Sequence, residues 1–458
     1  VARAGAVFVP VNTAFKGAFL EHGAKVAAAR VMIAAPEHLA ELAASAGRMP
    51  HLAMVFVAGP VPAIDLGHAV VRPFADLARG SDRPVDVPVA VGDVGAILFT
   101  SGTSGPSKGP LLPHGHLHLN PHVYIEQLGL SGEDVLYACL PLFHANALLL
   151  GVYGAMILGA PLVLAPRFSA SGWLDDVRRH GVTATNLLGT MLSFLMKQPA
   201  RPEDRRHGLR RVTAVPLVPS LAPGFVARYG VAPVELYGTT EINCPFYMPA
   251  DAPLRPGSCG RLIADWFDVR IADPANDDPV PVGTVGELLV RPRRAGTFLL
   301  GYCGMPEATV AAFRNLWFHT GDAFRADAEG WHYFVDRLRD CIRRRGENVS
   351  SFEVEAALLQ HPDVAEAAVV GVPSDVEDGE QEIKACLVAR PGGAIDPTAL
   401  WEHCDRRLPR FAVPRYIELL PALPRTATEK VRKEVLRAAG TSEAMDRAAL
   451  KPPAGPRG

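Results

Sequence analysis

Short apolar runs alternate along the first half of the chain with longer amphipathic segments, and this alternation predicts an α/β fold. Runs at 30–34, 182–188 and 211–217 have the length and composition of buried strands, and 19–29 is expected to form a helix. Strands that alternate with helices form βαβ units, which build a parallel sheet. A further strand is expected at 6–9, close to the first residue.

The pattern changes along the rest of the chain. The stretch at 60–88 is rich in Pro, Gly and Asp and is expected to be loop with little regular structure. After residue 265, short alternating runs at 268–272 and 286–291 predict a small antiparallel, barrel-like subdomain. Beyond residue 339 a compact α+β unit is expected, with helices and strands at 351–360, 365–372, 384–389 and 397–407.

These patterns predict two domains of unequal size. Residues 1–338 are expected to form a large N-terminal domain of layered α/β sheets with the β-barrel-like subdomain, and residues 339–450 a small mobile α+β C-terminal domain. Residues 451–458 are rich in Pro and Gly and are expected to be a disordered tail.

Composition narrows the class of protein. Hydrophobic residues make up 48% and charged residues 21% of the 458 residues, which allows a large core. The net charge of −2 gives no overall argument for nucleic acid or an anionic membrane, and no apolar run has the length of a membrane-spanning helix. Seven cysteines lie far apart without a Cys-x-x-Cys pair, so neither zinc nor a disulfide framework is indicated and a cytoplasmic location is expected.

The stretch at 95–109 carries the first candidate chemistry. A buried strand at 96–99 is followed by a loop of glycines and hydroxylated residues with one cation, Lys108. Glycines let the backbone approach a ligand closely, and backbone N–H groups, hydroxyls and a lysine can wrap a polyphosphate. The loop is not a Walker P-loop, because Gly109 follows Lys108 where Ser or Thr is required. A flexible surface loop is the alternative.

A second candidate stretch lies at 234–241, where a strand ends at Tyr237-Gly238 and hydroxyls and a carboxylate follow. Ligands of α/β sheets bind at the carboxyl ends of strands. Thr240 can bond a phosphate oxygen, and Glu241 can hold Mg²⁺, which prefers oxygen ligands. An ordinary turn is the alternative.

Other polar residues admit both functional and structural interpretations. Asp322 follows a Gly turn and is suited to bind two vicinal ribose hydroxyls, or it is a solvated turn residue. His144 in an apolar region is either packed or functional. Four histidines at 114–122 could suggest a metal site, but polar residues at a helix start are favoured because no carboxylate or cysteine lies among them.

Residues 100–109 resemble the phosphate-binding signature of the adenylate-forming superfamily, which comprises acyl-CoA synthetases, luciferases and peptide-synthetase adenylation domains. They fit its pattern Thr-Ser-Gly-Thr-[Thr/Ser]-Gly-x-[Pro/Ser]-Lys-Gly throughout. Further matches in the superfamily's order are Tyr-Gly-Thr-Thr-Glu at 237–241, Thr-Gly-Asp at 320–322, a long match at 334–355 and Pro-Arg-Thr-Ala-Thr-Glu-Lys at 424–430. The motifs at 12–17, 346–351 and 424–430 are most similar to crotonobetaine/carnitine-CoA ligases.

The resemblance implies an ATP site. The phosphates would be bound by Thr100, Ser101, Gly102, Thr103, Ser104, Gly105 and Lys108. Adenine would stack on Tyr237 beside Gly238 and Thr239, the ribose would contact Asp322 and Arg337, and Glu241 would hold Mg²⁺. His144 would lie beside the acyl-substrate pocket.

The resemblance also assigns roles near the C-terminus. Arg339 takes the hinge position, Gly346 would line the pantetheine tunnel of coenzyme A, and Lys430 would reach the α-phosphate. Asp336 and Glu429 stand where the superfamily commonly has glycine. Several βα units that precede the stretch matched by 5–12 in the superfamily are absent, so the chain is expected to be amino-terminally truncated or to begin at an internal start.

The resemblance implies an ATP-dependent acid:CoA ligase of fatty-acid or carnitine-type metabolism that forms an acyl-AMP and then an acyl-CoA thioester. Two alternatives stay open: an adenylating enzyme that transfers the acyl group to a carrier-protein thiol, and a truncated, non-catalytic acyl-nucleotide-binding protein. The expected partner is a small carboxylic acid, with no nucleic acid and no membrane span, and a homodimer is left open. The acid itself cannot be identified from the sequence, because dispersed residues build its pocket.

Overall fold

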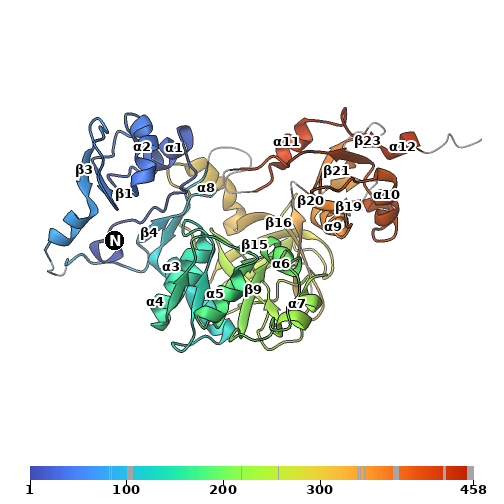
Figure 1. Cartoon of the computed structure of the whole chain (residues 1–458), viewed down its shortest axis with the longest axis horizontal. Coiled ribbons are helices and arrows are strands. Elements are labelled where there is room, and N and C mark those ends of the chain that lie inside the picture. The colour runs from blue at the N-terminus through green and yellow to red at the C-terminus, as the bar shows by residue number, and fades with distance from the viewer. Residues whose placement is uncertain are drawn as a thin grey trace, which may run out of the picture. The chain divides into compact units, whose positions relative to one another are not determined.

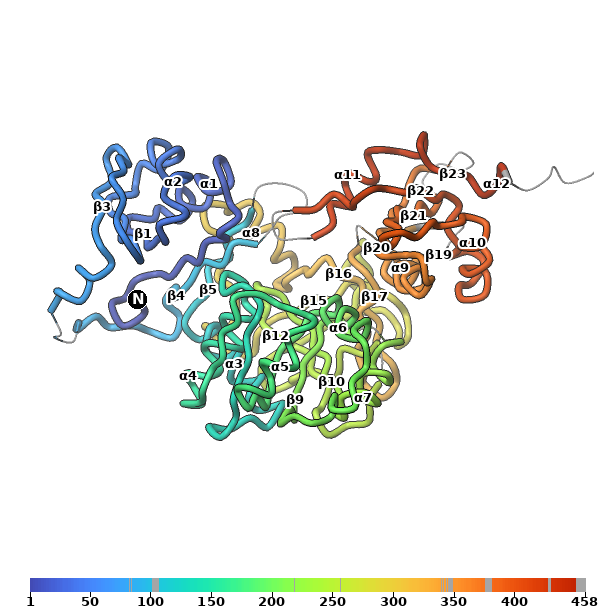
Figure 2. Tube along the Cα trace, in the orientation of Figure 1, coloured from blue at the N-terminus to red at the C-terminus, as the bar shows by residue number. Residues whose placement is uncertain are grey.

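The computed structural model describes residues 1–81, 83, 85–100, 107–217, 219–255, 257–338, 340, 342–344, 347–374, 381–426 and 430–450 (Figures 1 and 2). The chain divides into two compact units. Unit 1 comprises Val1–Val269, Val290–Phe318 and Glu329–His332, and unit 2 comprises Arg270–Leu289, His319–Ala328 and Tyr333–Gly458.

Unit 1 begins with a three-stranded parallel sheet in the order β1-β2-β3, formed by β1 (Val31–Ala34), β2 (Met54–Val57) and β3 (Val70–Pro73). Side chains of α1 (Ala18–Val26) and α2 (Leu39–Ala46) share one hydrophobic core with β2, which includes Leu20, Leu42 and Val55. The predicted strand at 30–34 and the helix at 19–29 are therefore present with shifts of one to three residues at their ends.

Two predictions for this region are wrong. The expected strand at 6–9 is reduced to one parallel bridge between Phe8 and Ala96, and residues Ala2–Ala4 form a 3₁₀ helix. Pro10 cannot donate to a sheet ladder, which ends the pairing at once. The stretch at 60–88 was expected to be loop, but it contains β3 and the 3₁₀ helix at Phe74–Arg79. A four-residue strand that ends in Pro73 gives little periodic signal.

The centre of unit 1 is a five-stranded parallel sheet in the order β10-β9-β8-β6-β7. Its strands are β6 (Leu136–Ala138), β7 (Leu162–Leu164), β8 (Ala184–Leu188), β9 (Arg211–Val215) and β10 (Pro233–Val234). The helices between them are η4 (a π-helix, Asn146–Tyr153), α4 (Gly154–Leu158), α5 (Trp173–Arg179), α6 (Gly189–Met196) and α7 (Ala222–Tyr229). This is the βαβ alternation that the apolar runs predict.

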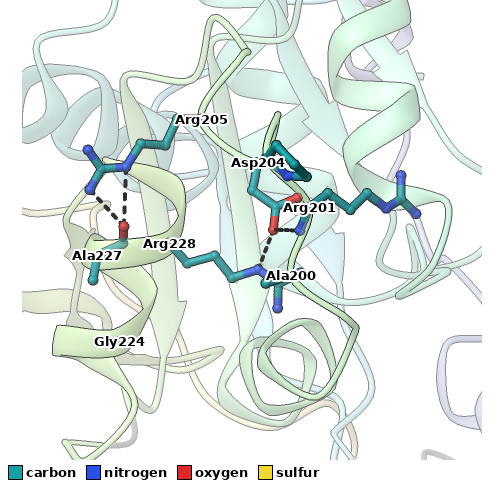
Figure 3. A pocket seen from close by; sticks show the side chains of 8 residues that line it. Ala200, Arg201, Asp204, Arg205, Gly224, Ala227 and Arg228 are labelled. Atoms are coloured by element: carbon teal, nitrogen blue, oxygen red, sulfur yellow. Dashed lines mark hydrogen bonds and ion pairs between the residues drawn. The ribbon is translucent and has the colours of Figure 1, made fainter.

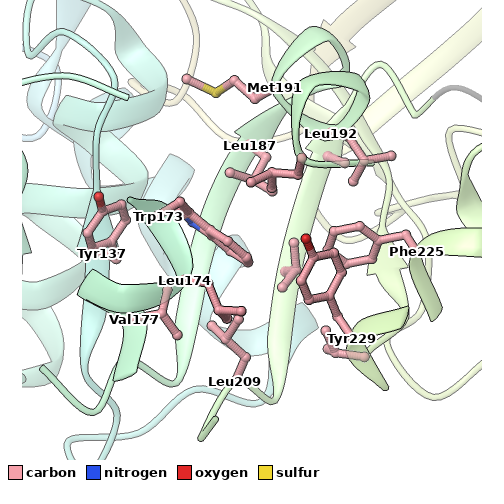
Figure 4. Close-up of a cluster of buried hydrophobic side chains, with 14 of the residues drawn as sticks. Tyr137, Trp173, Leu174, Val177, Leu187, Met191, Leu192, Leu209, Phe225 and Tyr229 are labelled. Atoms are coloured by element: carbon pink, nitrogen blue, oxygen red, sulfur yellow. The ribbon is translucent and has the colours of Figure 1, made fainter. Parts of the chain in front are cut away.

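Aromatic side chains fill the core between this sheet and helices α5, α6 and α7 (Figure 4). Trp173 is 1% exposed, and its ring meets that of Tyr229 edge-on with centroids 5.8 Å apart. Phe225 lies 4.7 Å from the same tyrosine ring. Edge-to-face aromatic packing at such distances adds about 0.5–1.5 kcal/mol to the burial itself. The sheet is therefore a rigid base for the loops at its strand ends.

Antiparallel pairs complete unit 1. β4 (Val94–Ile97) pairs with β5 (Leu111–Pro113), which leads directly into α3 (His114–Leu128), and β11 (Leu236–Thr239), β12 (Asn243–Tyr247) and β13 (Arg261–Leu262) form a three-stranded sheet. A further four-stranded sheet, most of whose residues belong to unit 2, has the order β14-β15-β16-β17. Its strands are β14 (Phe267–Ala272), β15 (Gly286–Pro292), β16 (Phe318–Ala326) and β17 (His332–Arg337). The helical segments α8 (Pro306–Ala312) and η5 (Arg314–Leu316) lie between β15 and β16 in the sequence.

Unit 2 contains the α+β arrangement that the sequence predicts beyond residue 339. Its four-stranded sheet has the order β20-β21-β22-β23, with β20 (Val364–Pro373), β21 (Gln381–Ala389), β22 (Tyr416–Leu419) and β23 (Met445–Asp446). The shorter elements are β18 (Ile342–Arg344), β19 (Glu347–Val349), α9 (Ser351–Leu358), α10 (Pro397–Asp405), η6 (Arg410–Ala412), α11 (Lys433–Ala438) and α12 (Arg447–Leu450). Among the described residues, no helix is both long enough and apolar enough to cross a membrane.

We expect the substitution Leu316→Gly to stabilise unit 1. Leu316 has φ +64° and is 85% exposed, so its side chain has a strained backbone and little packing to lose. The left-handed conformation costs an L-residue about 1–2 kcal/mol, and glycine removes this strain. Part of the gain is offset because glycine gives the unfolded chain more conformational entropy to lose on folding. The urea midpoint should rise by an amount equivalent to about 0.5–1 kcal/mol. The control Val310→Gly, at an exposed position inside α8, should lower it, and a lowered midpoint for Leu316→Gly would contradict the prediction.

Candidate active site

The ends of the glycine-rich loop are held together in unit 1. Residues 101–106 lie outside the described residues, so the predicted contacts of Ser101, Gly102, Thr103, Ser104 and Gly105 stay predictions. Thr100 N–H donates to the carbonyl of Lys108 at 2.9 Å, and the two residues form an antiparallel bridge. His22 on α1 donates from Nε2 to the carbonyl of Ser107 at 2.9 Å. The loop is therefore closed at its base.

Tyr302 links the loop to the predicted metal ligand. The Nζ atom of Lys108 lies 4.7 Å from the centroid of the Tyr302 ring, and the Tyr302 hydroxyl donates to Oε1 of Glu241 at 3.3 Å. Burial first, and then the charge of Glu241, raise the pKa of Tyr302, so the phenol stays a proton donor. Sequence reasoning did not assign a role to Tyr302.

Backbone pairing between two distant segments places Tyr302 between Lys108 and Glu241. Pro110 and Tyr302 form an antiparallel bridge, Leu111 N–H donates to the carbonyl of Gly301, and Cys303 N–H donates to the carbonyl of Gly109. Segment 301–303 thus runs beside segment 109–111 directly after the loop. Since about 190 residues separate the two segments in the chain, local sequence patterns could not reveal this contact.

Tyr237 and Gly238 lie on the first strand of the β11–β12 hairpin, and Glu241 lies in its turn. The ring centroids of Tyr237 and Phe246 are 6.1 Å apart, and the register shifts between Tyr237 and Thr239. A Cβ on Gly238 would lie 2.3 Å from the carbonyl oxygen of Asn243, so no other residue fits this position. Glu241 N–H donates to Oγ1 of Thr239 at 3.3 Å, which fixes the start of the turn.

Helix α3 supports the same turn from inside the unit. His116 is 1% exposed, and its imidazole bonds to the backbone of Thr240. Burial lowers the pKa of His116 to about 3, so the ring is neutral at physiological pH and donates one N–H to that carbonyl. The predicted phosphate ligand Thr240 therefore has a fixed backbone.

His144 lies two residues before the π-helix η4. Its ring is half-buried, with its centroid 4.6 Å from that of Phe143, and its carbonyl accepts from Leu148 N–H at 3.1 Å. π-helical turns occur often at functional sites. The substrate-pocket role of His144 stays a prediction.

Asp322 and Arg337, the predicted ribose ligands, form an ion pair in unit 2. Nε of Arg337 lies 3.1 Å from Oδ1 of Asp322, whose side chain is 2% exposed, and Arg337 is 48% exposed. Gly321, at φ +68°, makes the turn before Asp322, and its carbonyl accepts from Leu338 N–H. The two side chains are therefore held together with the arginine reaching solvent.

Glu287 on β15 shapes that turn. Its Oε1 accepts from Gly321 N–H at 3.0 Å, and its Oε2 accepts from Nδ1 of His319 at 2.9 Å. Asp277 lies on the other side of the imidazole, with Oδ2 3.6 Å from Nε2 of His319. Within the described residues these three form the one cluster with metal-ligand proximity. Because the two carboxylates lie against opposite nitrogens of one ring, the cluster is a polar triad that orients Gly321 and Asp322, and not a metal cage.

Asp336, which stands where the superfamily commonly has glycine, has a local structural role. Its Oδ2 accepts from Ser351 N–H at 2.6 Å at the start of α9, and Ser350 accepts from Glu353 N–H as the N-cap. Acceptors at a helix N-terminus satisfy amides that lack partners within the helix. The departure from glycine therefore anchors α9.

Lys430 lies at the end of a hairpin in unit 2. The carbonyl of Lys430 accepts from Thr426 N–H at 2.8 Å, and Arg425 forms an antiparallel bridge with Val431. An ion pair between Arg425 and Glu366 joins the hairpin to β20. Lys430 itself is exposed. The predicted hinge residue Arg339, the tunnel residue Gly346 and the turn residue Glu429 lie outside the described residues.

A separate hollow of about 430 Å³ on unit 1 contains none of these residues (Figure 3). It is lined by residues 200–202, Asp204 and Arg205, and by Gly224, Ala227 and Arg228 of α7. Nε of Arg228 lies 2.6 Å from Asp204, and Arg205 donates twice to the carbonyl of Ala227. The guanidinium groups drawn there bind the protein itself, so the hollow offers no argument for a ligand.

Comparison with known proteins identifies the family of the chain. Residues 1–302 match the family described as AMP-binding enzyme, and residues 353–430 match the AMP-binding enzyme C-terminal domain. The chain belongs to the AMP-binding enzyme family. Its predicted membership of the adenylate-forming superfamily is thereby confirmed.

Relatives of this AMP-binding protein carry the names that its motifs suggest. It is 34% identical to a crotonobetaine/carnitine–CoA ligase of Salmonella paratyphi C over 349 residues, which is 75% of this chain and 66% of that protein, just under two thirds. It is 33% identical to a feruloyl-CoA synthase of Amycolatopsis sp over 441 residues, 95% of this chain and 84% of that protein. The predicted similarity to crotonobetaine/carnitine-CoA ligases is confirmed.

Solved structures confirm the predicted α/β fold. The structure of ATP-bound MatB from Rhodopseudomonas palustris matches with a TM-score of 0.82 and 29% identity over 96% of this chain and 84% of that one. An anthranilate CoA ligase, AuaEII, in complex with anthranoyl-AMP also gives a TM-score of 0.82, at 27% identity over 95% and 83% of the two chains.

Proposed function

We propose that the protein is an ATP-dependent acid:CoA ligase that forms an acyl-AMP and then an acyl-CoA thioester. The contact chain from Lys108 through Tyr302 to Glu241 supports the first step most directly, because it puts the cation of the phosphate loop beside a carboxylate suited to Mg²⁺. The relatives named as CoA ligases and the ATP-bound and acyl-AMP-bound structure neighbours support the same reaction.

In the first step, a carboxylate oxygen of the acid attacks the α-phosphorus of ATP, and the bond to the β-phosphate bridging oxygen breaks to release pyrophosphate. Lys108 and the loop at 100–109 bind the phosphates, and Thr240 donates to a phosphate oxygen from a backbone fixed by His116. Asp322 and Arg337 bind the ribose, and Tyr237 stacks with adenine. Lys430 binds both the carboxylate and the α-phosphate, where negative charge builds.

Mg²⁺ would be held by Glu241 and would neutralise part of the triphosphate charge. The residues present fit this ion: Glu241 is half-buried, it offers hard oxygen ligands, and the Tyr302 hydroxyl orients one of them. A neutral phenol beside the carboxylate leaves its negative charge in place for the cation.

In the second step, the thiol of coenzyme A attacks the acyl carbon and AMP leaves with the bonding electrons of the acyl–oxygen bond. The domain boundary at 338/339, with Arg339 as the hinge, gives a lid over 339–450 that removes Lys430 before the thiol enters. Gly346 lines the path of the pantetheine arm, where a residue without Cβ leaves room. His144 contributes to the acyl pocket. These assignments rest on the motifs.

The substrate is a small carboxylic acid. The names of the relatives include carnitine, ferulate and anthranilate, which differ in charge and aromaticity, so they define the class and not the acid. The widely separated cysteines support a reducing cytoplasm, and the net charge of −2 gives nucleic acid no general attraction. Analytical sedimentation of the protein tests whether it forms a homodimer.

The experiment that tests this function is ATP–pyrophosphate exchange with a panel of short-chain, trimethylammonium and aromatic acids, with and without coenzyme A. Exchange driven by one class of acid, followed by acyl-CoA when coenzyme A is added, is expected. Exchange without thioester, rescued by a carrier-protein thiol, favours the carrier-transfer alternative. Nucleotide binding without exchange for any acid favours the non-catalytic alternative.

A further inference from the structure

The four histidines of α3 have different surroundings in the folded chain. His116 is buried against the Thr240 turn, whereas His118 is exposed and His122 is half-buried. The rings of His118 and His122 stack with centroids 5.7 Å apart and planes inclined by 23°. Two imidazoles therefore stand side by side at the surface of unit 1, and the proposed reaction uses neither.

Helical spacing produces this arrangement. Residues four apart in an α-helix lie on the same face one turn apart, so His118 and His122 project in the same direction. A metal ion binds imidazole nitrogen at about 2.0–2.1 Å, so one ion shared by two rings needs nitrogens roughly 3–4 Å apart. Rotation of the exposed His118 about its side-chain bonds can bring its ring to that separation from the half-buried His122. We propose that His118 and His122 form a two-histidine site for a divalent transition-metal ion of the zinc, nickel or copper class.

The groups around the pair are consistent with a bound cation. Glu126 is exposed one helical turn beyond His122, where its negative charge attracts a cation. The ring of Trp266 meets that of His122 edge-on with centroids 6.3 Å apart. Arg294 stacks on the same Trp266 ring at 3.9 Å and keeps its positive charge, which opposes the attraction by Glu126. Imidazole nitrogens select borderline metals over the Mg²⁺ that Glu241 is proposed to hold.

His114 is one turn before His118 but is placed differently. Its Nδ1 lies so close to Gly95 that a Cβ there would come within 2.7 Å of it, so one nitrogen packs on strand β4. The pair is therefore formed by His118 and His122. Single variants of the three histidines distinguish a His118–His122 pair from a His114–His118 pair.

The test is a calorimetric titration of the full chain with Ni²⁺ in buffer that contains excess Mg²⁺, which occupies oxygen-rich sites. One ion per chain is expected. His118→Ala and His122→Ala should each weaken binding at least tenfold, which corresponds to about 1.4 kcal/mol. His114→Ala and the surface control His180→Ala, at another exposed histidine, should bind as the wild type does.

The fluorescence of Trp266 gives an independent test of where the Ni²⁺ ion binds. Ni²⁺ should quench part of the tryptophan fluorescence of the wild type, and Trp266→Phe should remove that part without changing the affinity. Equal binding by wild type, His118→Ala and His122→Ala would mean an adventitious ion only and would overturn the proposal. Loss of binding in His114→Ala but not in His122→Ala would also overturn it. All four histidine variants should retain the wild-type melting temperature.

Discussion

Lys430→Ala is expected to abolish formation of the acyl-AMP and to spare the second half-reaction. Lys430 is exposed, and its carbonyl accepts from Thr426 N–H, a backbone contact that the substitution keeps. Loss of one preorganised donor at a developing negative charge costs about 10²–10³-fold in rate. Thioester formation from supplied acyl-AMP should stay close to the wild-type rate, because in that step the lysine is no longer at the phosphate. Pyrophosphate exchange and single-turnover thioester formation measure the two steps separately.

The matched control is Arg432→Ala, which removes another cation from the same hairpin. Nε of Arg432 lies 2.9 Å from Oε1 of Glu434 at an exposed site, and such surface ion pairs contribute little to stability. Both half-reactions of this variant should be close to wild type. Equal loss of both half-reactions in Lys430→Ala, with an unchanged melting temperature, would mean that Lys430 is not the cation of the first step.

Local sequence patterns were enough to propose those parts of the site whose residues are close together in the chain. The glycine-rich loop, the Tyr237 stretch and the Asp322 turn each have their candidate residues within a short stretch, so motifs could single them out, and their ligand roles stay predictions. Asp322 and Arg337 were each assigned to the ribose, without a predicted contact between the two side chains. The ion pair is what the structure adds.

Long-range pairing set the limit of that prediction. Tyr302 contacts both Lys108 and Glu241 only because segment 301–303 pairs with 109–111. Glu287 shapes the Asp322 turn from a neighbouring strand in the same way. Neither contact leaves a periodic signal, because the residue spacing between partners is set by the sheet order and not by the local chain.

The same reasoning explains why the histidines of α3 were difficult to interpret. A helix start was predicted, and α3 does begin at His114. The sequence cannot tell which of four histidines faces the interior, because that depends on where β11 and β12 pack. The structure separates His116, which is buried under the Thr240 turn, from the stacked pair of the exposed His118 and the half-buried His122.

Replacement of Glu235 by glutamine is expected to make unit 1 more stable at alkaline pH than the wild type. Glu235 lies between β10 and β11, and its side chain is buried. Its Oε1 accepts from Leu217 N–H at 3.2 Å. Burial raises the pKa of Glu235 to about 8, against the opposing effect of that one hydrogen bond. The carboxyl is therefore largely protonated at neutral pH in the folded protein.

The sign of the pH dependence follows from proton binding. Between the unfolded pKa of 4.5 and the folded pKa of about 8, the folded state holds the proton and the unfolded state has lost it. The contribution of Glu235 to the free energy of unfolding is fully present below the lower value, falls as pH rises and levels off above the upper one. The total change is about 4–5 kcal/mol, from roughly 1.4 kcal/mol per pKa unit.

Glutamine keeps the oxygen that accepts from Leu217 and does not titrate, so it isolates this contribution. Urea unfolding of unit 1 should give similar midpoints for wild type and Glu235→Gln near pH 5, with the variant increasingly more stable toward pH 9. The control Glu133→Gln, at an exposed carboxylate in the same unit, should follow the wild-type profile. If wild type and Glu235→Gln differ by the same amount at both ends of this range, Glu235 is ionised in the folded protein, and a cation or ordered water must then stabilise its charge inside the sheet.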